Sequence, residues 1–263
     1  METENKLTIR PSSVDNFYQC PQQWYQVFIN GKNSIPNSRA AIGTAIHAGV
    51  EQMWTESMQA KDKVYNPSAS IDKAMAAFKE EEQKGLEYDA NENTGSCAKE
   101  IIQGVDTFVE DIVPWTSIPT AVEKRFTVNI SDHPIVGAVS GTLDYIHEGL
   151  GIISDVKTSK RKPTVANHET QQSIYRYLAE ENGVKVNGNT IQAVVLKKKP
   201  EGHVLDMPIN IPKAKSAVNS LLDTLTVMDK GVVDPDILFR GNPRYYLCSP
   251  KWCGFYKSCK FVK

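Results

Sequence analysis

The sequence of 263 residues predicts a mixed α/β (α+β) fold, in which a mixed sheet is flanked by helices and carries an added helical part. Apolar residues recur at helical spacing through much of residues 11–113. They alternate with polar residues over 122–130, and two further strand patterns then flank a turn that contains glycines. A chain of this length can bury a full core, so we expect one domain over residues 1–263.

The helical part is expected over about residues 11–113. Pro11-Ser12-Ser13 is a plausible helix start, and Pro21 ends or restarts that helix. A second helix is predicted over 40–58, since Ile46, Val50 and Met53 begin an i, i+4, i+7 pattern. Residues 70–113 indicate one or two polar amphipathic helices, interrupted by the polar run 89–96.

The core of the fold is expected over about residues 118–200. It begins with a half-buried strand over 122–130 and continues with strands over about 135–146 and 152–157. A turn centred between Gly149 and Leu150 pairs Asp144 with Asp155 across this hairpin, with their carbons about 5 Å apart. A helix over 168–181, a strand over 191–196 and a late helix over 212–228 follow, the last within a C-terminal part of about 210–263.

Charge and composition limit the classes of protein to consider. Lys plus Arg number 30 and Asp plus Glu number 31, so the chain lacks the basic excess of a protein that coats nucleic acid. Local lysine patches at 157–162 and 197–199 are candidate phosphate contacts or simply a solvated surface. The N-terminus is polar and no apolar stretch reaches the length of a membrane span, which favours a cytoplasmic protein.

The hairpin carries the candidate chemistry. Asp155 and Lys157 are two apart on a strand and share one face. With Asp144 opposite, two carboxylates repel each other unless a hard cation such as Mg²⁺ lies between them. Lys157 beside that metal can hold a nucleophilic water and stabilise charge on a phosphate, which is an arrangement of metal-dependent phosphodiesterases. The spacing alone also fits surface carboxylates that pair with Lys157.

The cysteines suggest a second metal centre. Cys248, Cys253 and Cys259 fall within a short segment rich in turns, and Cys20 supplies a fourth thiolate if the chain ends meet. Four thiolates suit a tetrahedral zinc or an iron–sulfur cluster, and the spacing does not choose between them. Cys97 is left over as a plain thiol.

Several short motifs together resemble the PD-(D/E)xK nuclease superfamily, in particular RecB/Cas4-like exonucleases of phage or bacterial type that carry an iron–sulfur cluster. The motifs are Cys20-Pro21, Gly43 to His47, Gly141 to Asp144, Asp155-Val156-Lys157, Gln171 to Tyr175 and the terminal cysteines. The resemblance spans nearly the whole chain and implies a restriction-endonuclease-like core. Two features depart from the pattern: no proline precedes Asp144, and four residues separate Cys248 from Cys253 where the tighter Cas4 form has two.

The resemblance implies roles for individual residues. His47, Asp144, Asp155 and the carbonyl of Val156 would hold Mg²⁺ or Mn²⁺, and Lys157 would orient the attacking water. His47 read without the family pattern also fits a buried core histidine. The remaining implied site residues are Gln171 and Tyr175 on one helical face, Glu123 on the strand before the hairpin, and Cys20, Cys248, Cys253 and Cys259 as ligands of a [4Fe–4S] cluster that joins the chain ends.

These implications predict a metal-dependent DNA exonuclease that acts on strand ends, with single-stranded DNA as the expected substrate, in recombination, repair or genome processing. Recombination or replication proteins are expected partners, and no membrane. Two alternatives are a DNA-end-binding adaptor with a residual nuclease site and a Cas4-type nuclease that trims DNA for CRISPR spacers.

Overall fold

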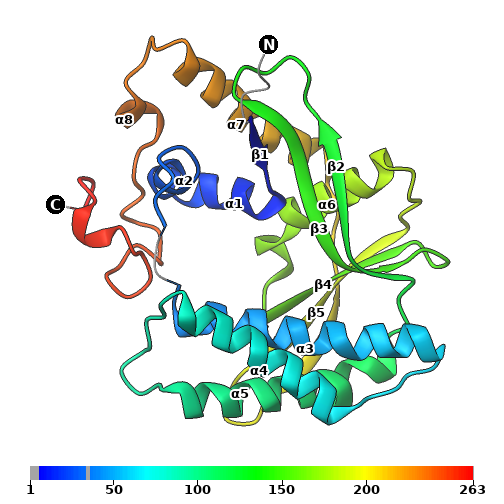
Figure 1. The fold of residues 1–263 in the computed structure, drawn as a ribbon. Helices are drawn as coiled ribbons and strands as arrows, with labels where there is room; N and C mark the ends of the chain where they lie inside the picture. Colours follow the sequence, from blue (N-terminus) through cyan, green and yellow to red (C-terminus); the bar gives the residue numbers. More distant parts are fainter. Residues whose placement is uncertain (1–5, 34–35, 263) are drawn as a thin grey trace.

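The computed structural model describes residues 6–33 and 36–262 and shows a six-stranded mixed sheet between two groups of helices (Figure 1). The predicted mixed α/β fold is therefore confirmed. The strands are β1 (Leu7–Ile9), β2 (Ala121–Asn129), β3 (Val136–His147), β4 (Ile152–Ser159), β5 (Gly188–Val195) and β6 (Glu201–Asp206).

The sheet has the order β1-β3-β4-β5-β6, and β2 pairs with the other edge of β3. β1 runs parallel to β3, and β5 runs parallel to β4, while the remaining pairs are antiparallel. Helix α6 (Glu169–Glu181) connects the parallel strands β4 and β5, as parallel pairing requires a crossover connection. This order puts β4, which carries Asp155 and Lys157, in the middle of the sheet.

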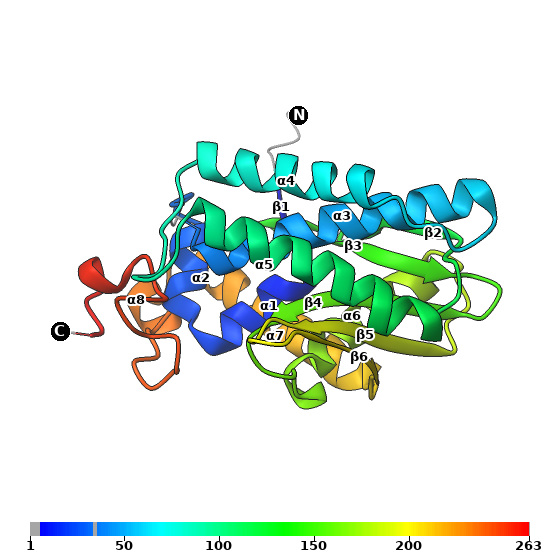
Figure 2. The same cartoon turned by 90° about the horizontal axis from the view of Figure 1, so that it is seen from below.

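One group of helices consists of α3 (Ser38–Ala60), α4 (Pro67–Gln83) and α5 (Thr94–Thr107), which form a layer against the sheet (Figure 2). A π-helical turn (Phe108–Ile112) and a 3₁₀ turn (Val113–Trp115) follow α5. An asparagine side chain caps each of the three helices by accepting a backbone N–H, which satisfies a donor that the helix leaves open. Trp54, Phe78 and Phe108 are fully buried between these helices and the sheet.

The second group comprises α1 (Pro11–Gln19), α2 (Pro21–Phe28), α6, α7 (Ile211–Asp229) and the short α8 (Pro235–Leu238). Short 3₁₀ turns lie at Val165–Asn167 and Tyr256–Ser258. Phe239 is fully buried and stacks on Trp24 and Tyr25 of α2, with ring centroids 6.2 and 4.6 Å apart. Helix α2 and the segment after α8 are thus joined by aromatic packing. Figure 1 shows the two segments near each other at the left of the molecule.

Most predicted elements agree with the structure to within a few residues, but β1 and β6 were not predicted. β1 has three residues, too few to show a periodicity. β6 contains Glu201, Gly202, His203 and Asp206, a polar composition that hides an edge strand. The division of the chain into three parts stays a prediction. No helix in the described part of the chain is long and apolar enough to cross a membrane.

Candidate active site

The β3–β4 hairpin has the predicted register but separates where the two aspartates lie. The paired residues are His147 with Ile152, Ile146 with Ile153 and Tyr145 with Ser154. The ladder ends at this last pair, one residue before the aspartates. The expected direct pairing of Asp144 with Asp155 across the ladder is therefore wrong. Asp144 Oδ2 instead accepts a hydrogen bond from the backbone N–H of Val156, at 2.6 Å. The β3–β4 ladder therefore ends next to the two carboxylates, at a fork of the two strands.

Asp155 and Lys157 lie side by side on β4. Lys157 Nζ is 2.6 Å from Asp155 Oδ2, and only 7% of the Asp155 side chain is exposed. The contact is a short ion pair between the Lys157 ammonium and a buried carboxylate oxygen, which raises the pKa of the ammonium. A hard divalent cation is one partner that fits such an oxygen.

Helix α3 presents a row of residues four apart to the forked strands. Gly43, His47 and Glu51 share one helical face because of this spacing. A Cβ on Gly43 would lie 2.8 Å from Thr158 Oγ1, so the glycine allows α3 to approach β4 closely. One turn further along, His47 Nδ1 lies 3.6 Å from Asp144 Oδ2. Gly43 therefore allows α3 to pack closely on β4. This close packing brings the imidazole of His47 near the carboxylate of Asp144.

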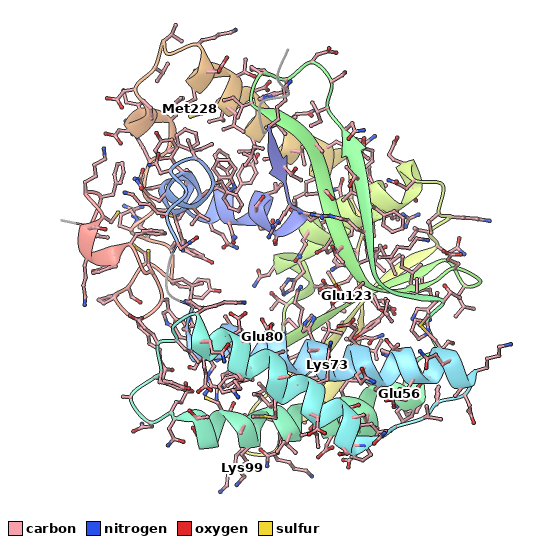
Figure 3. All side chains as sticks on the ribbon, viewed as in Figure 1. Glu56, Lys73, Glu80, Lys99, Glu123 and Met228 are labelled. Atoms are coloured by element: carbon pink, nitrogen blue, oxygen red, sulfur yellow. The ribbon has the colours of Figure 1, made fainter. Side chains whose placement is uncertain are left out.

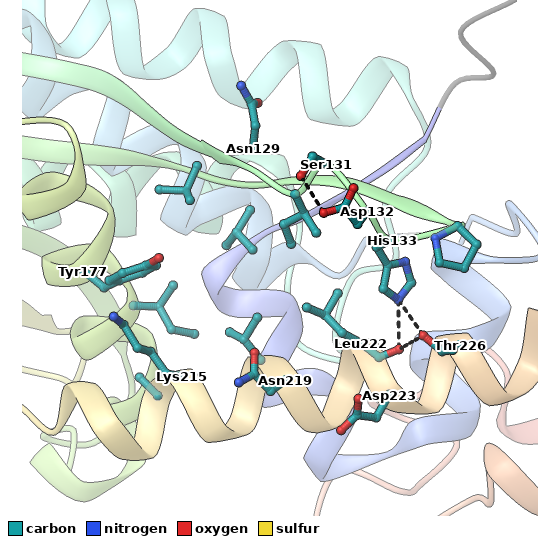
Figure 4. A pocket seen from close by; sticks show the side chains of 17 residues that line it. Asn129, Ser131, Asp132, His133, Tyr177, Lys215, Asn219, Leu222, Asp223 and Thr226 are labelled. Carbon is teal, nitrogen blue, oxygen red and sulfur yellow. Dashed lines mark hydrogen bonds between the residues drawn. The ribbon is translucent and has the colours of Figure 1, made fainter.

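Glu123 lies at an irregular position of the β2 backbone, next to the site. Val122 pairs with Tyr145 and Lys124 with Leu143, but Glu123 between them has a left-handed φ of 49°. This conformation is uncommon for a residue with a Cβ, and such strain gathers at functional sites. Figure 3 shows Glu123 where β2 and β3 approach α3.

The carboxylates of the site raise one another's pKa values. Burial, followed by the charges of Asp144, Glu51 and Asp155, raises the pKa of Glu123 to about 7. Burial and Asp155 raise the pKa of Asp144, against the opposing effect of His47. Burial favours neutral Lys157, but the two aspartates outweigh it and raise the pKa of that ammonium. This surplus of carboxylates suits a divalent cation.

Gln171 and Tyr175 lie on one face of α6, as predicted. Gln171 Nε2 donates a hydrogen bond to Tyr175 Oη at 3.3 Å. Burial and then the charge of Asp155 raise the pKa of Tyr175 to about 12, so the phenol keeps its proton. A Cβ on Gly141 would lie 2.7 Å from Tyr175 Cε1 and 2.8 Å from Pro11 Cγ. Gly141 therefore lets α6 and α1 pack onto β3 next to Asp144.

Three site residues were missed in the sequence. Glu51 lies one turn beyond His47, and that i, i+4 spacing could have indicated it. His168 precedes α6, and burial together with the charge of Lys157 lowers its pKa. Asp15 on α1 has its pKa raised to about 6 by burial, against the opposing charges of Lys213 and Lys157. No local pattern connects Asp15 or His168 with the hairpin.

The four predicted cysteine ligands line one pocket of about 230 Å³ between the chain ends: Cys20, Cys248, Cys253 and Cys259. Burial raises the pKa of Cys248, and the other three thiols add to the effect. Cys97 is buried in the separate core of α3, α4 and α5. Within residues 6–33 and 36–262, no three His, Cys, Asp or Glu side chains are arranged as a group that could hold a metal ion.

A sequence model of the PD-(D/E)XK nuclease superfamily matches residues 8–260. The chain belongs to this superfamily. A nuclease of this superfamily implies DNA as substrate, and its members typically use divalent metals, which agrees with the carboxylate surplus.

One solved structure has a similar fold. A crystal structure from Eubacterium rectale, described as a "putative exonuclease", aligns with a TM-score of 0.56 and 13% identity over 89% of this chain and 88% of that one. At this identity the likeness shows the fold alone. A structure named SSO0001 aligns with a TM-score of 0.40 and 12% identity over 88% and 89% of the two chains. No curated protein matches the sequence.

Proposed function

We propose that this nuclease is a metal-dependent exonuclease that hydrolyses phosphodiester bonds at DNA ends, with single-stranded DNA as its substrate. The observation that supports the proposal is a chain of contacts at the fork of β3 and β4: Lys157 lies 2.6 Å from Asp155, and His47 lies 3.6 Å from Asp144, which accepts from the backbone N–H of Val156. Recombination, repair or genome processing are the processes in which strand ends require such trimming.

The residue types of the donor set, two carboxylates, an imidazole and a carbonyl, suit a hard divalent cation. Asp144, Asp155, His47 and the carbonyl of Val156 would hold Mg²⁺ or Mn²⁺, since carboxylates and carbonyls suit both ions and imidazole favours Mn²⁺ over Mg²⁺. When bound, the ion supplies a water of lowered pKa and neutralises charge on the phosphate. The surplus of buried carboxylates around Lys157, which raise one another's pKa values, supports this assignment.

The chain's own groups would complete the chemistry. Lys157 stays protonated beside Asp155, so its ammonium can hold the attacking water and stabilise the charge that develops on the phosphate. Gln171 and Tyr175 would donate hydrogen bonds toward the scissile phosphate or fix Lys157, because the phenol remains neutral. Glu123 and Glu51 would add negative charge behind the metal ligands.

The cysteine pocket supports a second element of the proposal. Four thiolates are the ligands of a [4Fe–4S] cluster, and these four thiols share one pocket between the chain ends. We propose that Cys20, Cys248, Cys253 and Cys259 hold such a cluster, in the manner of RecB/Cas4-like nucleases. The support is the donor set and its common pocket, and zinc is the competing occupant.

End-labelled DNA tests the nuclease proposal directly. Purified protein is incubated with single-stranded and double-stranded DNA, each with Mg²⁺, Mn²⁺ or EDTA. We expect metal-dependent release of labelled nucleotides, faster from single strands. Closed circular single-stranded DNA should stay intact, because an exonuclease needs an end.

Matched variants assign the activity to this site. Asp155→Ala should abolish cleavage, while Glu80→Ala, which removes an exposed carboxylate on α4 (Figure 3), should cleave like wild type. Cutting of the closed circle would replace the exonuclease proposal with an endonuclease. Tight binding of ends by wild type without any cleavage in either metal would favour the DNA-end-binding adaptor instead.

A further inference from the structure

A cavity outside the carboxylate site is lined mainly by lysines. Its volume is about 310 Å³, and it lies between α5, the end of β4 and the β5–β6 connection. The chain as a whole has a net charge of −1, so this is a local concentration of positive charge. The lining residues are Lys99, Glu100, Gln103, Lys160, Leu196, Lys197 and Lys198.

Strand β4 leads from the active site to this cavity. Lys160 follows Lys157 by three residues, which in an extended chain is a distance of about 10 Å. The backbone N–H of Leu196 donates to the carbonyl of Ser159 at 2.7 Å, so the pairing of β4 with β5 continues to the edge of the cavity. A strand of DNA that leaves the forked hairpin along β4 would reach the lysines within a few nucleotides.

The positive charge of the cavity is only partly neutralised. Lys160 Nζ lies 3.4 Å from a Glu100 oxygen, and Glu100 is also paired with Arg39. Lys197 lies 2.5 Å from Glu201. Lys99 and Lys198 are exposed and have no ion pair within the part of the chain that the structure describes. Two ammonium groups are therefore available for an external anion.

We propose that this lysine cavity binds backbone phosphates of the DNA strand whose end lies in the active site. The inference rests on the proposed exonuclease function and adds the path of the substrate. Lysine ammonium groups contact phosphates as point charges and read no base edges, so the contact would be independent of sequence. It would keep a long strand on the enzyme between successive cuts.

Salt-dependent binding tests the path. The affinity for an oligonucleotide of about 16 nucleotides is measured in EDTA, so that no cleavage occurs, at several KCl concentrations. For Lys99→Gln/Lys198→Gln, the slope of log affinity against log salt should become shallower by about 1.4, since each lost phosphate contact on a single strand contributes about 0.7. Cleavage of a dinucleotide, too short to reach the cavity, should keep its wild-type rate.

The control removes two lysines elsewhere. Lys73→Gln/Lys79→Gln makes the same change of net charge on exposed positions of α4, on a different helix from Lys99 (Figure 3). Equal slopes for the two double variants would overturn the cavity as a path of the strand, as would a wild-type slope for Lys99→Gln/Lys198→Gln. If the wild type cleaves no DNA but Lys99→Gln/Lys198→Gln still changes the salt slope, the exonuclease function is refuted and the strand path stands.

Discussion

The carboxylate site and the cysteine pocket are supported by the fold in different ways. The carboxylate site draws its side chains from β2, β3, β4, α3 and α6, all regular elements packed on two buried cores. The three C-terminal cysteines lie beyond α8, in a segment whose regular structure is one 3₁₀ turn. The packing of helices and strands fixes the positions of the side chains that they carry. The positions of side chains on an irregular segment depend more on the group that they bind.

The contacts of the cysteine segment agree with this difference. Phe239 anchors its start, and Asn242 and Tyr245 donate hydrogen bonds to Gln19 at 2.9 and 2.6 Å. After Tyr245 the backbone hydrogen bonds are local turns between residues close in sequence. A change in the carboxylate site should therefore remove chemistry and leave the fold, while a change of a cysteine should loosen the joined ends.

The largest effect is expected from Asp155→Ala and Lys157→Ala. Each should lower DNA cleavage more than about a hundredfold, because one removes a metal ligand and the other the cation beside the attacking water. Thermal unfolding should show that both variants remain folded, since β4 is held on both sides by β3 and β5. Cleavage at the wild-type rate by either purified variant would contradict this site.

The next effect concerns the thiolates. Protein purified without oxygen should contain about four irons per chain, and Cys20→Ser or Cys253→Ser should lose both the iron and the brown colour. The unfolding free energy should fall by a few kcal/mol, since the cluster would close a very long loop between the chain ends. Cys97→Ala is the control that keeps its iron. One zinc and no iron in the wild type would refute the cluster and leave the carboxylate site standing.

Local patterns in the sequence predicted two geometric features near the carboxylates, and the roles of the residues there stay predictions. The hairpin register follows from the position of its turn, and the face shared by Gln171 and Tyr175 follows from helical spacing. The fork could not be predicted, because the turn position alone continues the ladder through Asp144 and Asp155. Asp15 could not be predicted either, since its position near Lys157 is set by the packing of α1 on the sheet.

The fold shows the same limit. Periodicity located the long helices and strands, because each buries a continuous apolar face. It failed for β1 and β6, whose pairing partners lie on distant or polar segments. The cysteine pocket was predicted only through the pattern of residue types, and the meeting of the chain ends became visible in the aromatic contacts of Phe239.

A smaller effect is expected where α3 meets β4. Gly43→Val should lower the unfolding free energy by about 1–3 kcal/mol, because its side chain would collide with Thr158 and push α3 from the sheet. Cleavage should also fall, since His47 is one turn away. Adding Thr158→Ala should recover part of both losses by opening space. Gly188→Ala, where an added Cβ meets nothing within 4 Å, is the matched control.

The smallest effect is expected at helix α1, which connects the carboxylate site with the cysteine pocket. Asp15 on this helix lies near Lys157, and Cys20 is at its C-terminal end. Burial raises the pKa of Asp15 from 3.8 to about 6, so the folded state favours the protonated acid. The contribution of Asp15 to the unfolding free energy is fully present below pH 3.8 and is lost as the pH rises through about 6. Asp15→Asn removes that decline and should raise the unfolding free energy near neutral pH. Urea titrations across this pH interval measure the unfolding free energy of wild type, Asp15→Asn and the exposed control Asp62→Asn. Identical pH curves for wild type and Asp15→Asn would show that the Asp15 carboxyl is not held in this buried, partly protonated state.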